Sequence, residues 1–104
     1  MPWGSWINQL PTGFFLTVHV AAFALGALFA WAAFRRELAG LAWAFSLFAA
    51  AEVSYMTYHL DWTVFLFAHT ISEVLDLVAF VLVFASAVLQ LAGARKSALE
   101  PSRG

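Results

Sequence analysis

The sequence predicts an all-α integral membrane protein, in which one domain covering residues 1–104 forms a bundle of three transmembrane helices. Composition is the first reason: 63% of the 104 residues are hydrophobic and only 11% are charged. Soluble domains are about half apolar and about a quarter charged. A soluble chain of this size would leave large apolar patches in water. We therefore expect the apolar excess to face lipid.

Three long apolar stretches are the second reason for this prediction. They cover residues 14–34, 38–58 and 64–91, and a helix needs roughly 20 residues to cross a bilayer core. The third stretch is the longest and has room to tilt or protrude. Prolines and glycines interrupt the chain before the first span, so we expect that segment to be irregular. Residues 94–104 are predicted to form a polar cytoplasmic tail.

The positions of the five basic residues predict the orientation. Arg35 and Arg36 separate the first two spans, whereas Arg95, Lys96 and Arg103 follow the third. Cytoplasmic loops of membrane proteins are enriched in Lys and Arg. We therefore expect the N-terminus outside and the C-terminus in the cytoplasm, with the chain integral to the plasma (inner) membrane.

Ionisable and polar side chains within the spans gather toward the outer half of the membrane. At 1.5 Å per residue, His19 and His69 both lie about 7–8 Å below the outer edge. On the second span, Glu52, Tyr55 and His59 follow the spacing i, i+3, i+7 and share one face. On the third span, His69, Glu73 and Asp76 also share a face.

These side chains predict a metal site, because charged groups inside a membrane are costly and mark functional positions. No Lys or Arg lies at this depth, so the acids are either protonated because of desolvation or paired with a positive group. That group is an imidazolium, a bound metal or a side chain of a partner subunit. Imidazole and carboxylate suit zinc, iron, manganese or copper(II), and the absence of cysteine disfavours copper(I). The predicted ligands are His19, Glu52, His69 and Glu73, with Tyr55, His59 and Asp76 as surrounding, mouth or relay residues.

The predicted function is to handle this ion, or to use it within an energy-transducing electron-transport complex. A second hypothesis is a non-catalytic accessory subunit of a respiratory or photosynthetic complex, with His19 or His69 binding haem or a chlorophyll-type pigment. A proton path along the Glu and His residues is a third hypothesis. We expect no enzymatic activity and no nucleic-acid partner, since the sequence has no hydrolase triad and no nucleic-acid-binding basic patch. The expected partners are lipid and either a homo-oligomer or a larger membrane complex.

Overall fold

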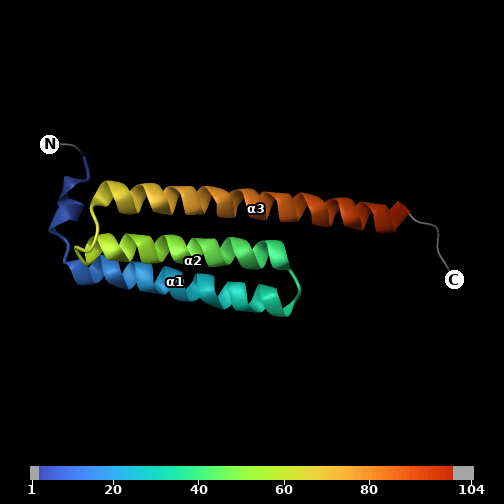
Figure 1. Cartoon of the computed structure of the whole chain (residues 1–104), viewed down its shortest axis with the longest axis horizontal. Helices are drawn as coiled ribbons and strands as arrows, with labels where there is room; N and C mark the ends of the chain where they lie inside the picture. Colours follow the sequence, from blue (N-terminus) through green and yellow to red (C-terminus); the bar gives the residue numbers. More distant parts are fainter. Residues whose placement is uncertain (1–2, 100–104) are drawn as a thin grey trace.

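The structure is a computed structural model that describes residues 3–99, and every regular element within that range is helical (Figure 1). Three of its helices are long and apolar enough to cross a membrane. The all-helical prediction is therefore confirmed. In chain order the elements are the 3₁₀-helix η1 (Ser5–Gln9) and the α-helices α1 (Thr12–Arg35), α2 (Ala39–His59) and α3 (Phe65–Leu99).

The first two helices match the predicted spans closely, but α3 is longer than predicted. It does not end near residue 91 but continues to Leu99, and Gly93 does not interrupt it. Residues 94–99, assigned to the tail by the sequence, are therefore helical, while residues 100–104 lie outside the described range. The 35 residues of α3 extend about 52 Å at 1.5 Å per residue, more than the roughly 30 Å of a hydrocarbon core.

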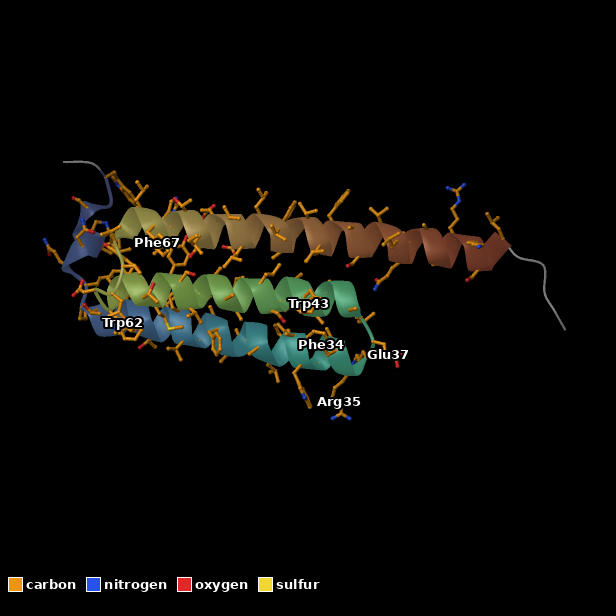
Figure 2. All side chains as sticks on the ribbon, viewed as in Figure 1. Phe34, Arg35, Glu37, Trp43, Trp62 and Phe67 are labelled. Atoms are coloured by element: carbon orange, nitrogen blue, oxygen red, sulfur yellow. The ribbon has the colours of Figure 1, made fainter. Side chains whose placement is uncertain are left out.

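The three α-helices lie in a row rather than in a closed ring. Helix α2 packs against α1 on one side and α3 on the other, and no backbone contact joins α1 to α3 within the described chain (Figure 1). We call the end that carries η1 and the 60–64 connection the η1 end. The opposite end, where residues 36–38 connect α1 to α2, is the Arg35 end. Figure 2 shows Trp62 and Phe67 at the η1 end and Phe34, Arg35 and Glu37 at the Arg35 end. Beyond the latter, α3 projects past the other two helices (Figure 1).

Small residues fill the interfaces of this row. A side chain as large as leucine would hold two helix backbones apart, so close packing within membranes favours Gly, Ala and Ser. A β-carbon at Gly26 would lie 2.9 Å from Cδ1 of Phe48, and one at Gly40 would collide with the side chain of Ser86. The buried residues of the described helices are Gly26, Ala30, Ala33, Ala42, Ala44, Ala49, Ala51, Ala68, Ser72 and Ala79.

Large apolar side chains cover the outside instead. Phe80 is 69% exposed, Phe84 65% and Leu89 72%. A water-soluble bundle buries such residues and exposes polar ones. Here small residues are buried and large apolar residues are exposed. This surface agrees with three helices that are long and apolar enough to cross a membrane.

Helices α1 and α2 end in the same C-terminal capping motif. Glu37 and Asp61 have φ values of 60° and 63°, in the left-handed region that glycine usually occupies at a helix end. The amide of Leu38 donates to the carbonyl of Ala33 at 2.9 Å, and that of Trp62 donates to Thr57 at 2.9 Å. These bonds from the sixth residue back to the first define a Schellman motif. They turn the chain within a few residues and hold each pair of helices antiparallel.

Candidate functional site: a His/carboxylate cluster on one face of α2

One face of α2 carries the site. Phe45, Phe48, Glu52, Tyr55 and His59 are spaced at i, i+3, i+7, i+10 and i+14, which places them on one side of the helix. Helices α1 and α3 flank α2, and two cavities lie between them. A polar cavity of about 450 Å³ lies at the η1 end. An apolar groove of about 490 Å³ lies closer to the Arg35 end. Glu52 lies on α2 between Phe48, which lines the groove, and Tyr55, which lines the polar cavity.

The contact between His19 and Glu52 is the centre of the cluster. Nδ1 of His19, on α1, meets Oε2 of Glu52, on α2, within hydrogen-bonding distance. The two side chains are only 17% and 12% exposed. The sequence placed both residues at similar depths, and the antiparallel packing of α1 on α2 brings them together. An imidazole and a carboxylate in contact form the beginning of a cation or proton site.

Tyr55 connects this pair to the third helix. Its ring stacks on that of His19, with centroids 5.2 Å apart. Its hydroxyl donates to Oε1 of Glu73, on α3, at 3.3 Å. Tyr55 therefore touches functional side chains from both neighbouring helices. The cluster extends across the whole row of helices.

His59 lies beside His19 and also borders the polar cavity. The two imidazole centroids are 5.2 Å apart, and the His59 ring stacks almost parallel on Phe15 at 4.8 Å. The sequence placed His59 at the mouth of the site, above His19. The full lining of the cavity is Ile7, Asn8, Leu10, Thr12, Phe15, His19, Tyr55, Tyr58, His59, Asp61 and Phe65.

The predicted stripe on α3 is divided between separate environments. The ring of His69 stacks on Phe65 at 5.2 Å, and no hydrogen bond or ion pair links it to another predicted ligand in the described part of the chain. Glu73 meets Tyr55. Asp76 borders the apolar groove, and its Oδ1 atom is buried without a hydrogen-bond partner among residues 3–99.

The four predicted ligands do not meet at one point. Over the described residues, no group of three or more His, Asp or Glu side chains is arranged to hold a metal ion. The structure brings His19 to Glu52, brings Glu73 to Tyr55, and leaves His69 apart. The row arrangement is the physical reason. His19 and His69 lie on α1 and α3, which α2 separates.

Three further residues shape the site, and sequence reasoning missed two of them, Phe15 and Tyr58. Ser72 is fully buried, and its hydroxyl donates to the carbonyl of Ala51 at 2.9 Å, which fixes α3 against α2 beside the cluster. Serine hydroxyls often join neighbouring membrane helices in this way. The spacing of four between Ala68 and Ser72 is the small-xxx-small pattern of close helix packing, and that signal was available. Phe15 and Tyr58 had no comparable signal.

The chain matches no protein-family model, no curated protein and no solved structure. Any assignment of function therefore depends on the residues of the chain itself.

Proposed function

We propose that this chain is an integral protein of the plasma (inner) membrane that takes up a transition-metal ion from the outer side at His19 and Glu52. The ion is either handled by the protein or used within an energy-transducing membrane complex, and the chain itself is not an enzyme. The observation that carries the proposal is the contact between His19 and Glu52, beside His59 and the polar cavity.

The distribution of charge supports the proposed orientation. Arg35 and Arg36 lie at the Arg35 end, and the projecting part of α3 carries Arg95 and Lys96. The guanidinium carbon of Arg35 lies 5.1 Å from the centroid of the Trp31 ring, a pairing suited to a membrane–water interface. The polar cavity is at the opposite end and therefore opens outward. A topology reporter fused after Gly104 should be active only in the cytoplasm.

The donor set supports an ion that binds and leaves. Structural zinc sites use four protein ligands, whereas sites with exchangeable positions use fewer and complete the shell with water. His19 and Glu52 supply one nitrogen and one oxygen, and His59 is the neighbouring imidazole, with its ring centroid 5.2 Å from that of His19. Zinc, iron, manganese and copper(II) accept these donors. The adjoining cavity of about 450 Å³ provides room for water.

Metal analysis of the purified protein tests this proposal. After dialysis against zinc or manganese in detergent, the wild type should retain about one ion per chain. Glu52→Gln should lower the affinity at least tenfold, because it removes the anionic donor in contact with His19. Glu37→Gln is the matched control, since Glu37 is exposed at the opposite end, and it should bind as the wild type does.

Two outcomes overturn the proposal. One is a Glu52→Gln variant that keeps wild-type affinity while its circular dichroism and gel-filtration profile stay normal. The other is an absorption spectrum with a Soret or chlorin band that His19→Ala or His69→Ala removes. The second result would establish the accessory-subunit hypothesis, with haem or pigment as cofactor.

A further inference from the structure

The apolar groove is a second cavity, distinct from the His/carboxylate cluster. Its volume of about 490 Å³ falls in the range of about 300–1,000 Å³ found for small-molecule sites. It lies between α1 and α3, with α2 as its floor. The groove is lined by Ala22, Leu25, Gly26, Phe29, Ala44, Phe45, Phe48, Asp76, Ala79, Phe80 and Val83.

Asp76 is the one ionisable group that residues 3–99 contribute to this lining, and it is unpartnered. Its Oδ1 atom is buried and accepts no hydrogen bond from any described residue. A buried polar atom without a partner is costly, and an unpaired charge is more so. Because α3 enters from the η1 end, Asp76 lies at the end of the groove nearest the carboxylates Glu52 and Glu73. Within the described chain, no Lys or Arg lines the groove.

Four phenylalanine rings form much of the remaining lining: Phe29, Phe45, Phe48 and Phe80. The faces of aromatic rings attract cations, most strongly where water is excluded. Gly26 contributes by its lack of a side chain, since a β-carbon there would press on the Phe48 ring. Aromatic rings and one carboxylate in the same groove are the recognition chemistry of a hydrophobic organic cation.

We propose that the groove binds a hydrophobic organic cation, with its charged group beside Asp76 and its apolar body among the phenylalanine rings. Such a ligand supplies the positive partner that the described chain does not provide at Asp76. An anion would be repelled by Asp76 and its neighbouring carboxylates, and a neutral apolar molecule would leave Asp76 unpaired. Because the groove is lined by helices long and apolar enough to cross a membrane, we expect the ligand to enter from the lipid phase. This site is independent of the metal proposal.

A pair of probes of similar size tests the charge requirement. Methyltriphenylphosphonium is a hydrophobic cation, and triphenylphosphine oxide is a neutral molecule of similar shape. Equilibrium dialysis with purified protein in detergent should show saturable binding of the phosphonium and only unsaturable partitioning of the oxide. Asp76→Asn should weaken phosphonium binding at least tenfold, because it removes the charge and keeps the side-chain shape. Ala22→Phe, which fills the groove from α1, should weaken it as well.

Glu73→Gln is the matched control, since Glu73 lies one turn away on the same helix but does not line the groove. It should change phosphonium affinity less than threefold. Asp76→Asn should leave zinc retention at the wild-type value, which separates this site from the one at His19 and Glu52. Equal saturable binding of both probes, or full phosphonium affinity in a folded Asp76→Asn variant, overturns the proposal.

Discussion

The two interfaces of α2 differ in what they contain. Against α3, α2 meets small residues: Ser72 is fully buried and bonded to the backbone at Ala51, and Gly40 faces Ser86. Against α1, a large ring enters a gap, because Phe48 packs over Gly26. That interface also contains the His19–Glu52 contact.

From this difference we predict that the α2–α3 interface mainly holds the fold together and that the α1–α2 interface binds the proposed ligand. Around Ser72, small side chains and one bond to the backbone close the α2–α3 interface, so that part of it tolerates little change in volume. The α1–α2 interface contains an imidazole–carboxylate pair next to an open cavity, so it is suited to admit a ligand. Substitutions at the first should mainly change stability. Substitutions of the polar pair in the second should mainly change binding.

The largest stability effect should come from Ser72→Leu. Ser72 has no exposed surface, so a leucine there forces α3 away from α2 and removes the bond to Ala51. Overpacking a filled interface costs about 1–3 kcal/mol and the lost bond about 1 kcal/mol more. We expect a loss of about 3 kcal/mol in unfolding titrations in mixed micelles. Val74→Leu, at an exposed position of α3, should change stability by less than about 0.5 kcal/mol. Similar stability of the two variants would contradict the close packing of α3 on α2 around Ser72.

Gly26→Ala should have a smaller effect. The new β-carbon would lie 2.9 Å from the Phe48 ring, and the cost of moving that ring is partly offset by the higher helix propensity of alanine. We expect a net loss of about 1 kcal/mol, which Phe48→Leu should relieve in the double variant. Gly40→Ala is the contrast, because rotation of the Ser86 hydroxyl removes most of its clash, so its net change should be near zero. If Gly40→Ala proves worse than Gly26→Ala, the Ser86 side chain does not rotate away, and the α2–α3 interface at Gly40 is as closely packed as it is at Ser72.

Tyr55→Phe tests the link from the cluster to α3. It removes the hydroxyl that donates to Glu73 at 3.3 Å but keeps the ring that stacks on His19. We expect a loss of about 0.5–1.5 kcal/mol in stability and less than a threefold change in metal affinity. Loss of metal binding in Tyr55→Phe would contradict a site at His19 and Glu52 alone and would add the Tyr55 hydroxyl or its partner Glu73 to the ligand set.

The last of these substitutions should raise the stability. Glu37 has a φ of 60°, a conformation that costs an L-residue about 1–2 kcal/mol. Glu37→Gly should therefore raise the stability by about 1 kcal/mol. Glu37→Ala retains the β-carbon and should show no such gain. A parallel rise in both variants would point to the loss of charge rather than to the backbone as the cause.

The spans were predictable from sequence because length and apolar character alone define them. The extension of α3 to Leu99 was not predictable, because residues 94–99 are polar enough to resemble a tail. None of them is proline, so the helix is able to continue through them. The arrangement of the three helices in a row was also not predictable from the sequence. When lipid and neighbouring helices are both apolar, hydrophobic periodicity does not reveal which face packs against protein. The informative pattern is small residues at a spacing of four, such as Ala68 and Ser72.

The site was predictable in part for a related reason. Depth along a helix follows from counting residues, so the matching levels of His19 and Glu52 could be inferred. The neighbour that each side chain meets depends on how the helices are placed around one another. The sequence therefore grouped His69 with His19 by depth, whereas the structure places α2 between their helices. Asp76 was treated as a relay residue, although its environment is the apolar groove.

The most direct test of metal binding at His19 and Glu52 compares two histidines at the same depth. Zinc binding should be measured on His19→Ala and His69→Ala, purified in the same detergent and shown to have equal helical content. We predict that His19→Ala loses at least tenfold in zinc affinity while His69→Ala, whose ring stacks on Phe65 away from Glu52, binds as the wild type does. Loss of zinc from His69→Ala with full retention in His19→Ala would contradict a site at His19 and Glu52.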